Sequence, residues 1–145
     1  MSIQRTYFNV LVADLAAARE FYVDFLGFGV GFDSKWFIQV AAPDAPQLEV
    51  GLLLRDHEIV PDAWRQPQQA GMLTIVVDDV DAMFETAQAR ALEIVEPPRN
   101  MFYGQRRMLL RDPDGLLVDV SSACDPDPEW SARVRGIGND VYVED

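Results

Sequence analysis

Tyr7-Phe8-Asn9-Val10-Leu11-Val12-Ala13-Asp14 is the segment from which the architecture of this chain can be read. Its first six residues, apolar or aromatic except for Asn9, have the length and composition expected for a strand. Asp14 then supplies a side chain that commonly caps the N-terminus of a helix. Apolar side chains follow at helical spacing, at Leu15, Ala18, Phe21, Tyr22 and Phe25. Gly27 is suited to end that helix, so the sequence predicts a strand followed directly by an amphipathic helix.

The same pattern starts again further along, because Met72 matches Tyr7 (72 − 7 = 65) and Asp79 matches Asp14 (79 − 14 = 65). Residues 72–77 are strand-like, and the next helical stripe consists of Val80, Met83, Phe84 and Ala87. More strand-like stretches follow each helix, at residues 28–32, 36–41 and 48–54 and at residues 94–95, 105–111 and 116–121. This order predicts an α+β fold of two βαβββ modules in tandem. The alternative is two unrelated βα units that look alike.

The boundaries follow from the repeat and from the positions of proline. We expect a first module with the start of a connector at 1–58, a connector at 59–71 and a second module at 72–124. A short helical turn is expected near Ala63-Trp64, and Asp112-Pro113-Asp114-Gly115 predicts a hairpin turn. Residues 125–145 form an acidic extension in which Trp130 is a candidate anchor. Its last segment either pairs with a sheet edge or is disordered.

Composition limits the classes of function. The chain has 145 residues, 49% of them hydrophobic, which suits one domain with a real core. The net charge of −12 opposes binding to nucleic acid. It either attracts a cationic ligand or serves only solubility. No apolar run reaches the length of a membrane span, and the N-terminus does not resemble a signal peptide, so we expect a cytoplasmic protein. Cys124 is the single cysteine, which excludes an intrachain disulfide and a cysteine-based metal cluster.

Several motifs occur in an order that is typical of a known family. The first are Val12-Ala13-Asp14-Leu15, Glu20-Phe21-Tyr22 and Leu26-Gly27-Phe28. The later ones are Val76-Val77-Asp78-Asp79-Val80, Tyr103-Gly104-Gln105-Arg106-Arg107, Arg111-Asp112-Pro113-Asp114-Gly115 and Val118-Asp119-Val120. Together they resemble the glyoxalase/bleomycin-resistance/extradiol-dioxygenase superfamily, also called vicinal oxygen chelate. The resemblance covers residues 5–123 and implies paired modules whose curved mixed sheets enclose a pocket, and a homodimer.

The resemblance also implies where a metal would bind. Metal-dependent relatives carry a ligand, usually histidine, on the first strand of each module and another, usually glutamate, on the last. Here these positions match Tyr7 and Met72, and Glu49 and Asp119. Thioether and phenol are poor ligands for divalent ions, and catalytic metal sites commonly need three protein ligands. We therefore expect no metal and no cofactor. The alternative is a divalent metal held by Glu49, Asp119 and waters.

The remaining residues at these positions suggest a ligand pocket. Glu49 and Asp119 are single acids within apolar strands, and they either face solvent, pair with arginine or line the pocket. The expected pocket residues are Tyr7, Asn9, Trp36, Gln39, Glu49, Met72, Phe102, Tyr103, Arg106 and Asp119. Tyr7 and Met72 could instead fill a former metal cavity as core residues. The only histidine, His57, lies in the Arg55–Glu58 stretch and is expected to be incidental.

Three functions compete. The leading hypothesis is a metal-free protein that binds or sequesters a small aromatic or cationic molecule, as the drug-binding branch of the resembled family does. The second is a lyase, isomerase or dioxygenase that uses a residual metal site or acid–base chemistry, with Glu49, Asp119 and Tyr7 as catalytic candidates. The third is a protein-interaction module whose pocket is filled.

Overall fold

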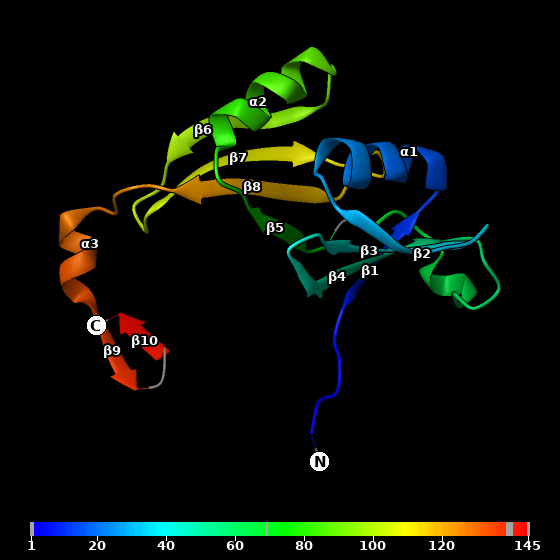
Figure 1. Cartoon of the computed structure of the whole chain (residues 1–145), viewed down its shortest axis with the longest axis horizontal. Coiled ribbons are helices and arrows are strands. Elements are labelled where there is room, and N and C mark those ends of the chain that lie inside the picture. The colour runs from blue at the N-terminus through cyan, green and yellow to red at the C-terminus, as the bar shows by residue number, and fades with distance from the viewer. Residues whose placement is uncertain (1, 69, 139–140, 145) are drawn as a thin grey trace. The chain divides into compact units, whose positions relative to one another are not determined.

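The computed structural model describes residues 2–68, 70–138 and 141–144 (Figure 1). It contains two four-stranded sheets, each with a helix that follows its first strand, and a small two-stranded sheet. The elements in chain order are β1 (Phe8–Val12), α1 (Leu15–Arg19), η1 (Glu20–Phe25), β2 (Gly29–Asp33), β3 (Phe37–Ala42), β4 (Ala45–Leu54), η2 (Asp62–Trp64), β5 (Met72–Val76), α2 (Val80–Ala89), β6 (Ile94–Asn100), β7 (Gln105–Arg111), β8 (Leu117–Ala123), α3 (Pro128–Arg133), β9 (Val134–Gly138) and β10 (Val141–Glu144). The predicted α+β class and the predicted order of elements through β8 are confirmed.

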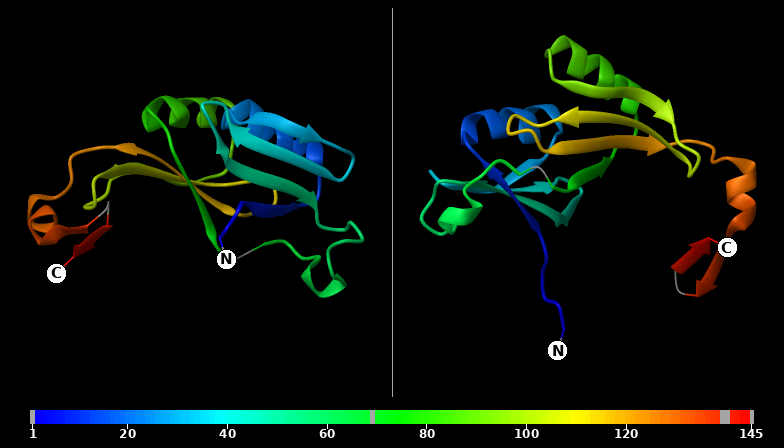
Figure 2. Two further views of the ribbon diagram at one scale, coloured as in Figure 1. Left: turned by 60° about the horizontal axis from the view of Figure 1, so that its bottom comes forward. Right: turned by 180° about the vertical axis from the view of Figure 1, so that it is seen from behind.

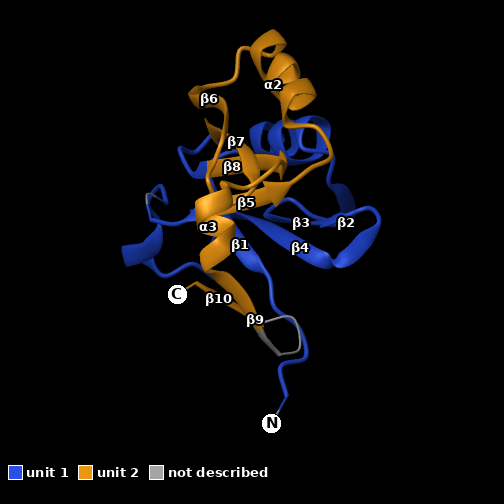
Figure 3. Ribbon diagram, turned by 90° about the vertical axis from the view of Figure 1, so that its left-hand side faces the viewer, with its two compact units in different colours: residues 1–72, 111–117 blue, residues 73–110, 118–145 orange. Residues whose placement is uncertain are grey.

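The contacts divide the chain into two compact units, coloured separately in Figure 3. Unit 1 comprises residues 1–72 and 111–117, and unit 2 comprises residues 73–110 and 118–145. Met72, the first residue of the predicted second module, groups with unit 1. The turn between β7 and β8, which belongs to the second module in sequence, groups with the first unit.

The sheet of unit 1 has the order β1-β4-β3-β2. Strand β1 runs parallel to β4, with Phe8 opposite Val50, whereas β2 and β3 are antiparallel to their neighbours, so the sheet is mixed. Alternate residues are buried on β1 and β3, and residues 50–53 are buried on β4, together with the apolar stripe of the following helix. The buried apolar residues of the sheet and helix are Val10, Val12, Ile38, Val40, Val50, Leu52 and Leu53 from the strands and Ala18, Phe21, Tyr22 and Phe25 from the helix.

The predicted helix of unit 1 is present, but it is not one continuous α-helix. Asp14 caps it as expected, because its carboxylate accepts hydrogen bonds from the backbone N–H groups of Ala16 and Ala17. From Glu20 the chain widens into the π-helix η1, in which bonds reach five residues back. Gly27 follows with φ of +86°, a conformation that favours glycine at a helix end.

The sheet of unit 2 has the order β5-β8-β7-β6, the same order as in unit 1, which confirms the duplication. Asp79 caps α2 through the N–H group of Ala82. Strand β6 is longer than expected, because it continues through Pro97 and Pro98 to Asn100. Proline is tolerated there because β6 is an edge strand, and the register shifts between Glu96 and Arg99.

The C-terminal extension forms α3 and an antiparallel β9–β10 ribbon (Figure 2). The described residues of the last segment therefore pair within the extension and not with an edge of either large sheet, while residues 139, 140 and 145 lie outside the described residues. Trp130 anchors the extension as predicted. Its ring meets Phe102 edge to face with centroids 5.9 Å apart, and its Nε1–H donates to Glu144 at 3.1 Å.

None of the helices in the described residues is long and apolar enough to cross a membrane.

Candidate functional site

The sheet of unit 1 carries a polar and aromatic face opposite its helix. Because side chains alternate along a strand, this face takes the neighbours of the buried residues on β1, β3 and β4. It contains Tyr7, Asn9, Gln39 and Glu49, all expected pocket residues. The Tyr7 residue is 42% exposed to solvent, and Gln39 and Glu49 are half-buried. Tyr7 is therefore not a core residue.

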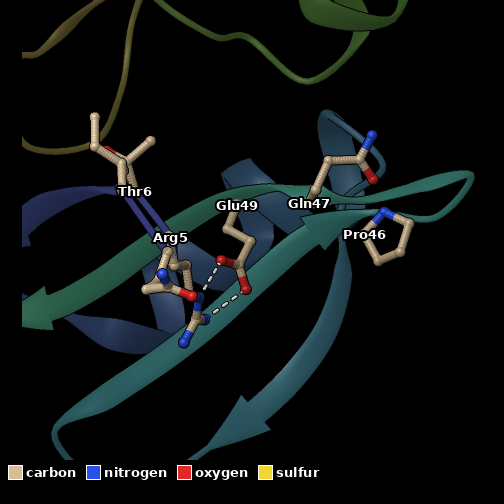
Figure 4. Close-up of a pocket in the computed structure, with 7 residues that line it drawn as sticks. Arg5, Thr6, Pro46, Gln47 and Glu49 are labelled. Carbon is tan, nitrogen blue, oxygen red and sulfur yellow. Dashed lines mark hydrogen bonds and ion pairs between the residues drawn. The ribbon is translucent and has the colours of Figure 1, made fainter. Parts of the chain in front are cut away.

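Glu49 binds a cation that the chain itself supplies. Nε and Nη2 of Arg5 donate to its two carboxylate oxygens, each at 2.5 Å, and the Gln39 amide donates to the same group. Figure 4 shows Arg5 and Glu49 directed toward each other. The guanidinium also lies 4.8 Å from the centre of the Tyr7 ring, within the range of a cation–π contact. The hydrogen bonds from Arg5 lower the pKa of Glu49, so Glu49 is a weaker base than an ordinary carboxylate.

An open hollow of about 590 Å³ lies beside this ion pair. Its walls come from the segment that precedes β1 and from the start of β4, and Figure 4 shows Pro46 and Gln47 on the β4 side. The lining residues are Ile3, Gln4, Arg5, Thr6, Pro46, Gln47 and Glu49. Arg5 thus lines the hollow and covers the carboxylate of Glu49.

Gly51 leaves room on the same face for its neighbours. A Cβ atom at this position would lie 2.1 Å from Oδ1 of Asn9 and 2.7 Å from the ring of Phe37. Both distances are far inside van der Waals contact. The absence of a side chain at Gly51 therefore lets Asn9 and Phe37 lie over β4.

A continuous aromatic array also belongs to unit 1. Phe32 and Phe37 have centroids 6.2 Å apart, and Phe37 and Trp36 are 5.7 Å apart. His57 then stacks on Trp36 at 4.4 Å with an interplanar angle of 15°. Phe32 is 51% exposed, so one end of the array is open to a ligand. Rings in offset or tilted arrangement provide contact area for a planar molecule.

In unit 2, Asp119 lies on β8 and is only 3% exposed. Its Oδ2 accepts a hydrogen bond of 3.3 Å from Thr74 on β5, while its Oδ1 has no hydrogen-bond partner. Burial raises the pKa of Asp119, and the positive charge of Arg107 on β7 opposes that change. Asp119 therefore does not face solvent, and it forms no direct ion pair with any residue that the structure describes.

The other predicted pocket residues have different surroundings. Arg106 is bound by the carboxylate of Asp81 on α2, at 2.8 and 2.9 Å, and by Asn100. Phe102 and Tyr103 form an edge-to-face pair between β6 and β7, where Phe102 contacts the C-terminal extension. Met72 is 47% exposed, which excludes the alternative that it fills a core cavity.

The donor set does not fit a metal ion. Both oxygens of Glu49 are engaged by Arg5, and the first-strand positions carry the phenol of Tyr7 and the thioether of Met72. Asp119 adds one carboxylate near the cationic Arg107. Among the described residues no three His, Cys, Asp or Glu side chains come together as a ligand set.

Several residues of these sites are not evident from the sequence. Arg5 and Gly51 were not recognised, because nothing local indicates that Arg5 meets Glu49 or that Asn9 needs the space over Gly51. His57 was expected to be incidental, yet it extends the aromatic array. Arg107, with Arg106 and Arg111, is a candidate arginine partner of the two acids from the sequence, and its charge does act on Asp119. The signal that could have located His57 is the pairing register of the strands. Leu54 donates a backbone hydrogen bond to Trp36, and the N–H group of His57 donates to Leu54, so His57 lies near Trp36.

Comparison with known proteins identifies relatives of this architecture. The family model described as Glyoxalase/Bleomycin resistance protein/Dioxygenase superfamily matches residues 4–120. A comparison with curated proteins gave no match.

Solved structures of similar architecture include a member of the same superfamily from Sphaerobacter thermophilus DSM 20745. It is 28% identical, with a TM-score of 0.69 and coverage of 83% of this chain and 98% of that one. TnmS3, an antibiotic binding protein from Streptomyces sp. CB03234, is 29% identical, with a TM-score of 0.67 and coverage of 85% and 98%. A glyoxalase/bleomycin resistance protein/dioxygenase from Nocardioides, 20% identical with a TM-score of 0.65 and 86% coverage of both chains, shares the fold.

Proposed function

We propose that this chain, which belongs to the Glyoxalase/Bleomycin resistance protein/Dioxygenase superfamily, binds and sequesters a planar aromatic cation on the sheet face of unit 1. One observation carries the proposal. The guanidinium of Arg5, itself a planar cation, is held by the carboxylate of Glu49 and the ring of Tyr7, and the Gln39 amide donates a hydrogen bond to that carboxylate. These groups would recognise an external planar cation in the same way.

The surroundings of this face support the same class of ligand. The hollow beside Glu49 is open to a small molecule, and the array from Phe32 to His57 supplies rings for stacking. The net charge of −12 favours the approach of a cation. The 29% identical relative TnmS3 is an antibiotic binding protein, which agrees with a sequestering role. The homodimer and the cytoplasmic location stay predictions.

Arg5 competes with the ligand in this proposal. As long as its side chain covers Glu49, only the fraction of molecules in which Arg5 has moved away can bind an external cation, and the apparent affinity is reduced by that fraction. Arg5→Ala should therefore increase the affinity, and Glu49→Gln should decrease it.

The test uses ethidium, a planar cation, and phenanthridine, its uncharged ring system. We expect titration calorimetry to show tighter binding of ethidium than of phenanthridine, a gain of roughly tenfold in Arg5→Ala and a loss in Glu49→Gln. Glu58→Gln, which removes an exposed carboxylate in the connector, is the matched control and should change nothing. Equal affinity of ethidium for all four proteins, or no binding at all, would refute the proposal.

A further inference from the structure

The described N-terminal residues, 2–6, form an extended segment that lies outside the sheet of unit 1. Pairing between β1 and β4 begins at Phe8, opposite Val50, so the segment precedes the parallel ladder. Figure 1 shows it leaving the start of β1. Each of its residues is exposed, and Ile3 is 88% exposed. The position of the segment therefore depends on side-chain contacts and not on strand pairing.

Arg5 attaches this segment to the sheet. Its guanidinium donates to both carboxylate oxygens of Glu49 on β4 and lies over the ring of Tyr7. The side chain of Gln4, in contrast, donates to Ser2 within the segment itself. Among the described residues, the hydrogen bonds that join the segment to the sheet all come from Arg5. One side chain therefore holds the whole segment in place.

This attachment is suited to exchange, because its two partners differ in exposure. The Arg5 side chain is 53% exposed, whereas the Glu49 side chain is 9% exposed. Arg5 can therefore move into water while Glu49 stays on the sheet face. An ion pair with an exposed partner adds little to stability and is weakened by salt. Because Arg5 engages both oxygens of Glu49, a second planar cation can take the same position only after Arg5 leaves.

The hollow beside Glu49 couples this exchange to the rest of the segment. Ile3, Gln4 and Thr6 line it together with Arg5, and Pro46 and Gln47 line it from β4. When Arg5 leaves Glu49, the segment loses its attachment and this side of the hollow moves with it. Entry of a ligand and release of the segment are therefore one event.

We propose that residues 2–6 are an autoinhibitory latch, closed by Arg5 on Glu49, and that binding of a cation releases the latch. The inference rests on the proposed function and adds a change in the protein, since the N-terminal segment is detached from the sheet when the site is occupied. If Arg5 covers Glu49 in about nine of ten molecules, the apparent affinity falls roughly tenfold and the latch is open in about one molecule in ten without ligand. The same factor thus governs affinity and release.

Trypsin reports release of the latch directly, because cleavage after Arg5 requires its side chain to leave Glu49 and enter the protease. The rate is measured on the full-length protein by mass spectrometry, as the appearance of a chain that begins at Thr6. We expect saturating ethidium to raise this rate roughly tenfold, since proteolysis follows the population of the open form. Phenanthridine should leave the rate unchanged. Cleavage after Arg135, in the C-terminal extension, controls for any effect of ethidium on trypsin.

Glu49→Gln provides the second measurement. Without ethidium this variant should be cleaved after Arg5 about as fast as ligand-bound wild type, and Glu58→Gln, the matched control, should behave like wild type. Cleavage of Glu49→Gln at the slow rate of wild type would overturn the latch, because Glu49 then does not hold Arg5.

Calorimetry on the same samples separates the two proposals. If ethidium binds to wild type but does not accelerate cleavage after Arg5, the latch is wrong and the cation site stands. If ethidium does not bind to wild type or to Arg5→Ala, the cation site is wrong and the latch falls with it.

Discussion

The phenol of Tyr22 donates a hydrogen bond of 2.9 Å to Oδ2 of Asp112, a residue 90 positions later in the chain. Tyr22 is fully buried in the helix of the first module, and Asp112 is 4% exposed in the turn between β7 and β8. The other oxygen of Asp112 accepts from the backbone N–H groups of Asp114 and Leu116. The carboxylate therefore shapes its own turn and ties that turn to the helix, which explains why residues 111–117 group with unit 1.

Tyr22→Phe should destabilise the protein, because it leaves Oδ2 of Asp112 buried without its donor. The expected loss in the free energy of unfolding is about 1–3 kcal/mol. Urea unfolding followed by circular dichroism measures it. Tyr142→Phe, at a position that is 67% exposed, is the control and should stay within about 0.5 kcal/mol of wild type. Equal stability of the two variants would contradict the importance of this hydrogen bond.

The stability contributed by Asp112 should depend on pH. Burial raises the pKa of this carboxyl above its ordinary value of 3.8, so the folded state holds the proton more tightly than the unfolded chain. The resulting stabilisation is complete below the unfolded-state pKa and is lost as the pH rises through the folded-state pKa.

The measurement is the difference in the free energy of unfolding between wild type and Asp112→Asn, from about pH 3.5 to about pH 6.5. We expect wild type to lose stability relative to the variant as the pH rises. Arg5 lowers the pKa of Glu49, so the contribution of Glu49 to stability rises with pH. This contribution is the same in wild type and variant and cancels in the difference. A difference that stays constant with pH would show that Asp112 has the same pKa in the folded and the unfolded protein.

Gly51→Ala should disturb both stability and ligand binding. The new methyl group would meet Asn9 at 2.1 Å and Phe37 at 2.7 Å, so both side chains must move. Overpacking of this kind costs about 1–3 kcal/mol. Gly31→Ala is a matched control on a strand of the same sheet, since its nearest atom, in Gln39, lies 3.7 Å away. Thermal unfolding of the two variants compares them, and similar melting temperatures would exclude a steric requirement at Gly51.

His57→Ala should expose one face of the Trp36 ring, because the two rings are stacked at 4.4 Å. We expect the fluorescence of Trp36 to shift to longer wavelength and to be quenched more strongly by acrylamide. Trp64 and Trp130 are replaced by phenylalanine in both proteins so that Trp36 is the only tryptophan observed. The double replacement with His57 intact is the control, and identical quenching in the two proteins would mean that His57 does not cover Trp36 in solution.

Much of the fold could be predicted from local patterns. The spacing of apolar residues located the strands and helices of both modules, and Asp14 and Asp79 marked the helix starts at which the structure shows their capping bonds. These signals are local, because a cap or an amphipathic stripe involves residues within a few positions of one another. Strand β6 was underestimated, because proline normally ends a strand and the edge position that tolerates Pro97 and Pro98 is not visible in the sequence.

The sites were predicted only in part, because they depend on contacts between distant residues. The sequence identified Glu49 and Asp119 as unusual acids within apolar strands, from strand alternation and the resemblance to the family. It left open whether each carboxylate faces solvent, pairs with arginine or lines a pocket. Strand pairing and side-chain packing resolve this differently in the two units, since Glu49 meets Arg5 whereas Asp119 is buried with a free oxygen. Those outcomes depend on register and burial, which exist only after the chain has folded.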